Sequence, residues 1–357
     1  MSHTILQKIR NKMGESDIDS LIISHTPNIR YLTGFSGDFG YVIISQKQAL
    51  FYTNSLYVEE ARNVVDEVFE VIELQDDIYK SFSELDASAL GKRIGFESDK
   101  TTFTSYTKLK NTLSEFELLP QNNIIEGFRE IKSSHEIEYI KHAQAISEKV
   151  YTRVLSMVKD GVEECDLAIE IDYLFRRSGG ERSAFNTIVA SGPNTSKPHA
   201  VGGRRKISPG DLVLFDMGTV VNGYASDMTR TVVFGKASRE QKKVYNAVLN
   251  AQLAAIEGIH SGVKCADVDN IARKSIISEG YGDKFVHSLG HGVGLEVHEN
   301  PVLSKKSEGF LQNNVVVTVE PGIYISGWGG VRIEDMIVVK DNRCENLTNI
   351  SKTLVEL

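Results

Sequence analysis

The sequence predicts an α/β (α+β) protein of two domains, on three observations. First, 357 residues are more than one hydrophobic core usually supports. Second, the first third of the chain alternates short apolar runs with helical patterns, which is typical of an α/β domain. Third, a long helical pattern begins after Glu126, and strands with glycine-rich turns dominate from Thr187 onward. We therefore expect one domain over residues 1–126 and a second over residues 127–357.

The first domain is expected to interleave strands with helices. Ile5, Leu6, Ile9 and Met13 have the spacing of one helix face, and residues 56–65 have the pattern of another helix. Short apolar runs bounded by turn residues predict strands at 21–23, 41–44, 49–53, 68–72, 93–96 and 117–119. No group of residues in this domain indicates catalysis.

The second domain is expected to open with a helix over residues 131–156, because Ile137, Ile140, Ala143 and Ile146 form a helical stripe. Further helices are predicted at 166–176, 239–259 and 265–279. Strand-rich segments separate them. The chemistry of the chain is concentrated in those segments.

A β-hairpin is predicted over residues 211–234. Asn222-Gly223 between apolar strands is a strong signal for a two-residue turn, because both residues tolerate positive φ. Such a turn pairs Val221 with Tyr224 and, counting back, Asp216 with Thr229. Asp216 and Asp227 then project from the same face as diagonal neighbours, unless a bulge shifts the register.

Two more strands, at 315–320 and 331–339, are predicted around a glycine-rich connection at 327–330. They carry Glu320 and Glu334, but the connection is too long to define their register. His291 lies between Gly290 and Gly292, where missing β-carbons allow a tight approach of the backbone to a buried ion.

These segments together supply five potential metal ligands, each in a strand-like or glycine-framed setting: Asp216, Asp227, His291, Glu320 and Glu334. Any one such acid is more often a turn cap or a salt-bridged edge residue, so the metal interpretation depends on the whole set. Buried carboxylates are costly unless a cation neutralises them. Four carboxylates and one imidazole can hold two divalent cations about 3.5–4 Å apart, an arrangement that activates water for hydrolysis. Oxygen-rich coordination favours Mn²⁺, with Co²⁺ or Zn²⁺ as substitutes.

The bulk properties exclude several classes of protein. A net charge of −8 argues against a dedicated nucleic-acid-binding protein. No run of residues is apolar and long enough for a secretory signal or a membrane span. The three cysteines are an odd number and far apart, which indicates a reducing compartment. We expect a cytoplasmic protein with no membrane and no nucleic-acid partner.

The strings DMG, SDMTRT, HSLGHGVGLEVHE, VEPGIY and GGVRIED resemble, in order and spacing, those of proline-specific metallopeptidases of the pita-bread fold. That group includes Xaa-Pro dipeptidase (prolidase) and aminopeptidase P. The resemblance implies a creatinase-like N-terminal domain and a catalytic domain with a curved, mostly antiparallel sheet flanked by helices. It also implies a homodimer and peptide substrates with proline at the second position.

The resemblance further implies roles for single residues. Asp216 would bind one metal, Asp227 and Glu334 would bridge both, and His291 and Glu320 would complete the ligand set. A metal-bridged hydroxide would be the nucleophile, and Glu320 would pass its proton to the proline nitrogen. The resemblance places the remaining site residues around the substrate or behind the ligands: His199 and His298 at the scissile carbonyl and the intermediate, His287 at the proline subsite, and Tyr324 and Arg332 as supporting residues.

One position departs from the prolidase pattern. Many prolidases have an arginine directly after the proline of the HE-x-P string, where it binds the free carboxylate of a dipeptide. Here Val302 follows Pro301, and valine makes no such contact. We therefore expect activity on longer Xaa-Pro peptides as well as dipeptides. The alternatives are a strict Xaa-Pro dipeptidase, with Lys305 or Lys306 as the cation, and a catalytically silent binding protein.

Overall fold

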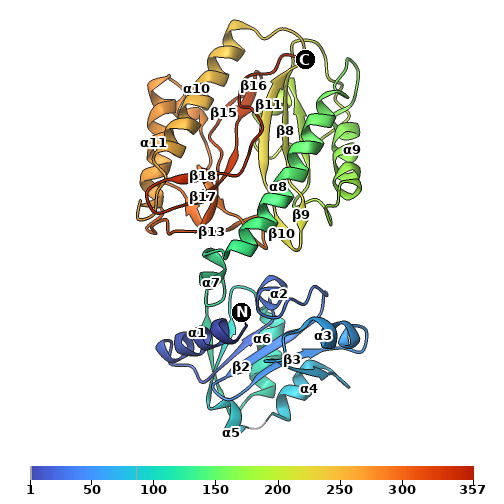
Figure 1. The fold of residues 1–357 in the computed structure, drawn as a ribbon, viewed down its shortest axis with the longest axis vertical. Coiled ribbons are helices and arrows are strands. Elements are labelled where there is room, and N and C mark those ends of the chain that lie inside the picture. The colour runs from blue at the N-terminus through green and yellow to red at the C-terminus, as the bar shows by residue number, and fades with distance from the viewer. Residues whose placement is uncertain (1, 86) are drawn as a thin grey trace. The chain divides into compact units, whose positions relative to one another are not determined.

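The computed structural model describes residues 2–85 and 87–357 and divides into two compact units, Met1–Arg129 and Glu130–Leu357 (Figure 1). The division lies close to residue 126, where the sequence changes character. Each unit encloses its own buried apolar clusters. Within the described ranges, no helix is both long and apolar enough to cross a bilayer.

The first unit is built on a six-stranded sheet in the order β4-β3-β2-β1-β5-β6. β2 is antiparallel to its two neighbours, and the other pairs are parallel. The strands are β1 (Ser20–Ile23), β2 (Tyr41–Ser45), β3 (Ala49–Thr53), β4 (Glu70–Glu73), β5 (Arg93–Glu97) and β6 (Glu117–Gln121). The helices are α1 (Ser2–Glu15), α2 (Thr26–Thr33), α3 (Val58–Val64), α4 (Ile78–Ser83), α5 (Ala87–Leu90), α6 (Phe103–Thr112) and α7 (Glu126–Glu130). All the expected strands are confirmed, whereas α2 and α4 to α7 were not predicted.

Both faces of this sheet are covered. Successive residues of β1 alternate between two clusters, with Leu21 and Ile23 in one and Ile22 in the other. Because side chains alternate across a strand, a continuous apolar run is the pattern of a strand buried on both sides.

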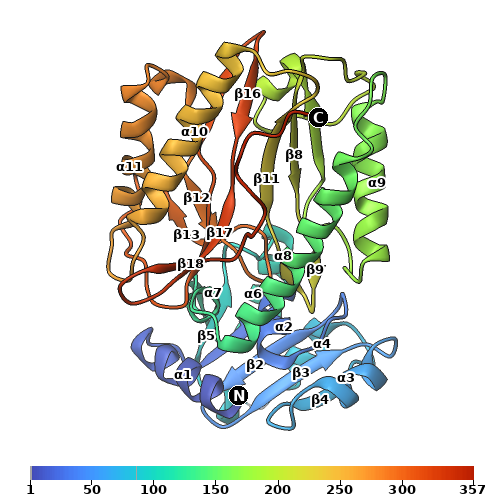
Figure 2. The ribbon, with the colours of Figure 1, turned by 45° about the horizontal axis from the view of Figure 1, so that its top comes forward.

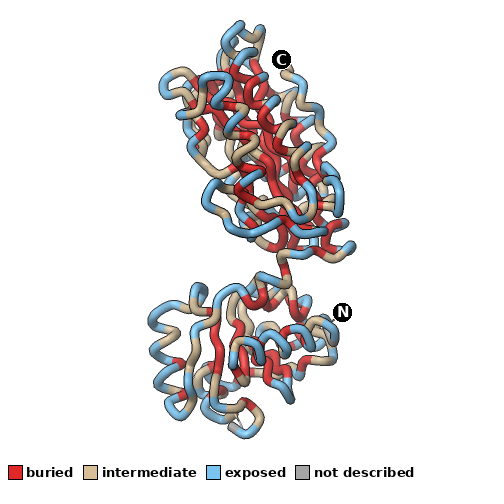
Figure 3. The backbone as a smooth tube through the Cα atoms, turned by 90° about the vertical axis from the view of Figure 1, so that its left-hand side faces the viewer, coloured by how far each residue is buried: buried red, intermediate tan, exposed pale blue. Residues whose placement is uncertain are grey.

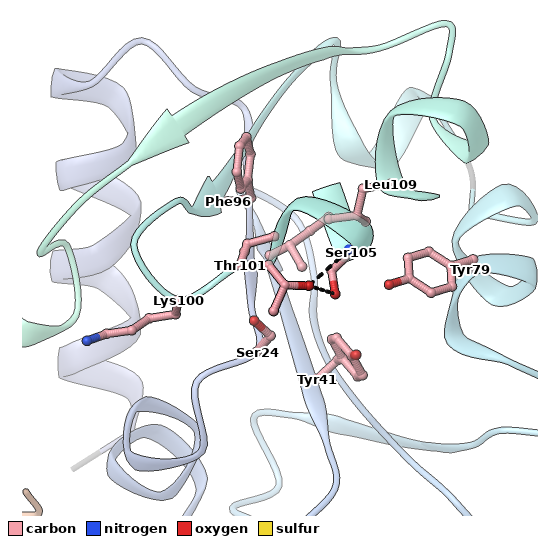
Figure 4. Close-up of a pocket in the computed structure, with 10 residues that line it drawn as sticks. Ser24, Tyr41, Tyr79, Phe96, Lys100, Thr101, Ser105 and Leu109 are labelled. Atoms are coloured by element: carbon pink, nitrogen blue, oxygen red, sulfur yellow. Dashed lines mark hydrogen bonds between the residues drawn. The ribbon is translucent and has the colours of Figure 1, made fainter. Parts of the chain in front are cut away.

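A cavity of about 200 Å³ lies where β1 and β5 end (Figure 4). Aromatic rings line one part of it and hydroxyl groups from the start of α6 line another, with Thr102 and Ser105 hydrogen-bonded to each other. Its lining is Ile22, Ser24, Tyr41, Tyr79, Phe96, Lys100, Thr101, Thr102, Ser105 and Leu109. None of the residues expected to act in catalysis lines this cavity.

The second unit has two helix pairs with antiparallel strands between them (Figure 2). The helices α8 (Ser134–Leu155) and α9 (Glu164–Arg177) share a core with the sheet β11-β8-β7. The helices α10 (Arg239–Glu257) and α11 (Cys265–Ser278) share a second core with the sheet β13-β12-β14-β17-β18. The buried residues follow the strands through the interior of the unit (Figure 3).

The strands of this unit are β7 (Ile188–Ser191), β8 (Leu212–Met217), β9 (Val220–Val221), β10 (Tyr224–Ala225), β11 (Met228–Val233), β12 (Gly290–Gly292), β13 (Glu299–Leu303), β14 (Val316–Val319), β15 (Gly322–Ile325), β16 (Gly329–Arg332), β17 (Asp335–Val339) and β18 (Cys344–Asn346). Two 3₁₀ turns are also present, η1 (Gly192–Ser196) and η2 (Gly282–Lys284).

The first acidic hairpin has the predicted register. Val221 pairs with Tyr224 and Asp216 with Thr229, so no bulge shifts the strands. Asn222 and Gly223 both have positive φ, as a two-residue turn of this type requires. Each of the two expected strands is interrupted, however, giving β8 with β9 and β10 with β11.

The second hairpin corrects one expectation. Residues 331–339 do not form a single strand, because β16 ends at Arg332 and β17 begins at Asp335 in a different sheet. Gly322 pairs with Arg332 and Val319 with Asp335, so the register is the same on both sides of the break. Glu320 therefore lies opposite Glu334.

The first helix of this unit also begins later than expected, at Ser134 rather than at 131. The Ser133 hydroxyl accepts a hydrogen bond from the Glu136 backbone, and the Glu136 carboxylate accepts one from the Ser133 backbone. This capping box satisfies the free N–H groups of the first turn and defines where the helix starts.

Gly290 should be essential to the packing of β12 on β14. A Cβ at Gly290 would lie 2.0 Å from the Thr318 carbonyl oxygen, which is backbone and cannot move aside. We expect Gly290→Ala to lower the free energy of unfolding by about 2 kcal/mol or more, measured by urea denaturation. Gly309→Ala is the matched control, because no atom lies within 4 Å of its added Cβ. Equal stability of the two variants would contradict this packing.

Candidate metal centre

The alternation of side chains along the strands brings the acidic residues to one place. Val213, Phe215 and Met217 of β8 face the α8–α9 core, so Asp216 faces away from those helices. In the other half, Val317 and Val319 face the α10–α11 core, so Glu320 faces away from that pair. By the same alternation, the side chains of Thr229, Arg332 and Glu334 also face away from the helices, because their strand neighbours lie in the two cores. The acidic groups therefore lie on inner strand faces between the two halves.

The structure brings the five predicted ligands together. Ligand atoms of Asp227, His291 and Glu334 lie within 4.8 Å of one another. The His291 Nε2 atom is 3.6 Å from Asp227 Oδ2 and 3.3 Å from Glu320 Oε1. Asp216 joins the group through Arg332, which contacts both Asp216 at 2.6 Å and Glu320 at 3.9 Å.

Three of the four carboxylates lie at interruptions of the strands. Asp227 lies between β10 and β11, Glu320 follows β14, and Glu334 lies between β16 and β17. The Glu334 N–H donates to the Thr229 carbonyl at 3.1 Å, and the Glu320 N–H donates to the Leu289 carbonyl at 2.8 Å. At Glu320 and Glu334 the interruptions are thus hydrogen-bonded to neighbouring segments, which fixes the backbone behind these two carboxylates.

The electrostatics of the group fit a bound cation. Burial raises the pKa of Asp227 and of Glu334 well above the usual range, and the neighbouring carboxylates raise each pKa further. Burial also raises the pKa of Asp216, although the Arg332 charge opposes this. Burial acts in the same direction on Glu320, but the hydrogen bond and charge of His291 outweigh it and lower the Glu320 pKa. Two buried carboxylates, Asp227 and Glu334, and two largely buried ones, Asp216 and Glu320, form with the His291 imidazole a donor set that a divalent cation would neutralise.

Arg332 holds two of the carboxylates in place. Its Nη2 donates to Asp216 Oδ2 at 2.6 Å, and its Nε donates to the Thr229 hydroxyl at 3.0 Å. That hydroxyl in turn donates to Glu334 Oε2 at 2.6 Å. Thr229 was not identified as a site residue from the sequence, although its predicted pairing with Asp216 was a signal for it.

Tyr324 connects Arg332 to His287. The Tyr324 hydroxyl accepts from Arg332 Nη1 at 2.8 Å and lies 2.9 Å from His287 Nε2. Burial raises the pKa of Tyr324 to about 12, so the hydroxyl stays protonated and donates to the imidazole. The other ring nitrogen, Nδ1, lies 2.8 Å from the Ser288 carbonyl and donates to it. Because both nitrogens of His287 are hydrogen-bonded, the ring can contact a further group only through its apolar face.

The other two predicted histidines are exposed. His199 lies in the turn that follows η1, and His298 lies just before β13. The His298 and His291 ring centroids are 4.3 Å apart. Burial lowers the pKa of His287 and of His298, and the nearby His199 lowers both further. His199 and His298 therefore lie close to the acidic group without being part of it.

Comparison with known protein families agrees with this geometry. The model of metallopeptidase family M24 matches residues 138–341, more than half of the chain. The chain belongs to metallopeptidase family M24. Residues 5–131 match the creatinase/prolidase N-terminal domain. The expected pita-bread fold is thereby confirmed, and so is the expected enzyme class. An M24 peptidase uses divalent metal ions, and the acidic donor set is suited to them.

Similar M24 peptidases cover the chain from end to end. An Xaa-Pro dipeptidase of Pyrococcus horikoshii is 37% identical over 352 residues, covering 98% of each chain. The structure of an Xaa-Pro dipeptidase from Bacillus anthracis is similar with a TM-score of 0.97 and 37% identity over 100% of both chains. The structure of an X-Pro aminopeptidase from Thermotoga maritima has a TM-score of 0.90 and 34% identity, covering 96% of this chain and 98% of its own.

The raised carboxyl pKa values predict how metal-free protein responds to pH. Folded protein binds more protons at Asp227 and Glu334 than unfolded protein does, so stability falls as the pH rises above about 4. The melting temperature of metal-free protein should decrease from acidic to neutral pH, and saturating Mn²⁺ should abolish the decrease. Asp227→Asn should flatten it, because an amide carries no charge at any pH. A decrease of the same slope in wild type and Asp227→Asn would contradict the prediction.

Proposed function

We propose that this M24 metallopeptidase is an Xaa-Pro peptidase, which hydrolyses the bond between the first residue of a peptide and a proline at the second position. The observation that carries the proposal is the convergence of four carboxylates and His291 on one place, with His199, His287 and His298 beside it. Relatives of full length named as Xaa-Pro dipeptidase and X-Pro aminopeptidase support the choice of substrate.

The proposed ligands are Asp216, Asp227, His291, Glu320 and Glu334, which together would hold two divalent cations. Mn²⁺ is our choice, because four of the five ligands are carboxylates. When bound, a pair of such cations makes a water acidic enough to act as a nucleophile near neutral pH. Arg332 keeps one Asp216 oxygen engaged, and Thr229 does the same for one Glu334 oxygen. Each contact leaves the second oxygen of the carboxylate, Oδ1 of Asp216 or Oε1 of Glu334, for a cation.

Glu320 is the proposed proton carrier. It accepts the proton of the attacking water and delivers it to the proline nitrogen as the bond breaks. Its backbone is fixed by the hydrogen bond to Leu289, and its Oε1 atom lies between His291 Nε2 at 3.3 Å and the Thr318 hydroxyl at 3.4 Å. A carboxylate held in this way can serve first as base and then as acid without rearrangement of the chain.

The exposed histidines bind the substrate in this proposal. His199 donates to the scissile carbonyl oxygen and stabilises its developing charge, and His298 supports the intermediate from the side of His291. His287 packs its ring face against the proline ring, which suits a residue whose two nitrogens are already occupied. An amide nitrogen of proline has no N–H to offer, so positioning through the ring replaces the usual hydrogen bond.

The substrate is proposed to include peptides longer than two residues. Val302 is 40% exposed and pairs with His291 across β12 and β13, so an apolar side chain occupies the position beside the site. A valine side chain has no donor for the free carboxylate of a dipeptide. A dipeptide therefore binds at this position no more tightly than a longer peptide. The names of the Pyrococcus and Bacillus relatives favour the second candidate, a strict Xaa-Pro dipeptidase.

A substrate panel tests the proposal. Purified protein with Mn²⁺ should cleave Ala-Pro and an Ala-Pro-Xaa tripeptide, while Ala-Ala should be hydrolysed at least about 100-fold more slowly. Cleavage of the dipeptide alone would establish the strict dipeptidase. Equal rates on Ala-Pro and Ala-Ala would refute proline specificity altogether.

Two substitutions separate metal binding from catalysis. Asp227→Ala should abolish turnover and lower the bound metal, because Asp227 would be one of the metal ligands. His199→Ala should lower kcat by about 100-fold while calorimetry still shows full metal binding. Loss of metal from His199→Ala would show that His199 is a ligand rather than a substrate contact.

A further inference from the structure

Lys132 and Glu299 form an ion pair in the interior of the second unit. The Lys132 Nζ atom lies 3.0 Å from Glu299 Oε2, and the two side chains are only 1% and 7% exposed. Burying an ammonium and a carboxylate is unfavourable unless each compensates the other, and removing one partner weakens the compensation of the second charge. No step of the proposed hydrolysis uses either group.

Glu299 closes the loop that carries His298. Its Oε1 atom accepts a hydrogen bond from the Glu296 backbone at 3.0 Å. The carboxylate also lies against Gly294, where an added Cβ would be 2.5 Å from Oε2. The Gly294 N–H donates to the Glu296 carbonyl at 3.0 Å, and the Gly294 carbonyl accepts from Ala225, two residues before Asp227. One carboxylate therefore holds the middle of the loop by a hydrogen bond and packs against its first residue, Gly294.

The loop returns to His291 because the β12–β13 pairing shifts its register. His291 pairs with Val302, but its neighbour Gly292 pairs with Glu299, leaving Asn300 and Pro301 outside the ladder. This bulge brings His298 back over the His291 ring, with centroids 4.3 Å apart. A bulge of this kind redirects a side chain at the end of a strand.

His298 has little else to hold it. Its side chain is exposed, and within the described part of the chain its ring makes no hydrogen bond. Its position therefore depends on the backbone of the loop. That backbone depends on Glu299.

Lys132 supplies a rigid support for Glu299. Its N–H donates to the Asn314 carbonyl at 3.0 Å, and the adjacent Ile131 forms a β-bridge with Val315. Ser133, the next residue, caps α8. The backbone that carries the ammonium is thus continuous with the start of α8 and hydrogen-bonded to the segment that leads into β14.

We propose that the Lys132–Glu299 ion pair positions His298 over the metal-site histidine, and that Lys132 is a positioning residue for the reaction. The inference rests on the proposed function, in which His298 contacts the reacting peptide. A displacement of about 1 Å at such a group can cost about 100-fold in rate. Lys132 contacts none of the five proposed metal ligands, so its loss leaves metal affinity unchanged.

A double-mutant cycle tests the inference. Lys132→Met, His298→Ala and the double variant are compared in kcat on Ala-Pro with saturating Mn²⁺. We expect Lys132→Met to lower kcat at least about 10-fold with its Mn²⁺ dissociation constant within about 2-fold of wild type. The double variant should be no slower than the slower single variant, because Lys132 acts through His298. Lys132→Arg should restore most of the activity. Losses that multiply in the double variant would overturn the proposal.

Lys352→Met is the matched control. It removes an ammonium from another buried carboxylate, Asp335, with a contact of 2.7 Å and the same change of residue. In the Lys352→Met/His298→Ala double variant, the fold-losses in kcat of the two single variants should multiply, because Lys352 does not act through His298. Should Lys132→Met fail to fold, Glu299→Gln takes its place in the cycle, because the amide keeps an acceptor for the Glu296 N–H but removes the charge.

A second measurement does not depend on activity or metal. In metal-free protein with isotope-labelled histidines, the His298 ring signals are assigned by their loss in His298→Ala. They should shift or broaden in Lys132→Met and stay unchanged in Lys352→Met. Unchanged His298 signals in Lys132→Met would overturn the positioning role, whatever the substrate of the enzyme. Absence of Xaa-Pro cleavage by the wild-type protein would refute only the proposed function.

Discussion

Mutual repulsion among four carboxylates that are buried or largely buried is the constraint on which the second unit depends. Asp216, Asp227, Glu320 and Glu334 lie on inner strand faces, where burial strengthens the repulsion between neighbouring charges. Arg332 is the only guanidinium that the described residues place among them, and it contacts Asp216 directly. One cationic side chain cannot balance four acids. The remaining charge makes the site a receptor for divalent cations, in keeping with membership of a metallopeptidase family.

The fold meets this constraint with two similar hairpins. In each hairpin, the side chains on one strand face pack against the helices in a core, and those on the other face lie in the acidic site. Interruptions of the strands at Asp227 and Glu334 free these residues from the regular ladder while keeping the register on either side. A continuous strand would hold the carboxylates in a flat row. The interruptions let them converge instead.

The residues around the site divide into a rigid set and an accessible set. Asp227, Glu334, Arg332 and Tyr324 are buried, and Arg332 donates hydrogen bonds to Asp216 and to the Tyr324 hydroxyl. His199 and His298 are exposed and lie in turns, which suits the contact with a peptide that we propose for them. Accessibility removes the packing that normally fixes a side chain. The backbone contacts of Glu299 then become the means of fixing His298.

The sequence by itself determined the features that depend on local chemistry. Asn222-Gly223 defines a two-residue turn, and the period of two then places Asp216 opposite Thr229. The strings around the five acidic and imidazole groups were enough to predict the family. Only the tertiary structure placed Glu320 opposite Glu334, ended β16 before Glu334, and paired Lys132 with a carboxylate 167 residues away. Short turns fix their geometry through φ and ψ alone, whereas contacts between distant segments depend on how whole sheets and helices pack.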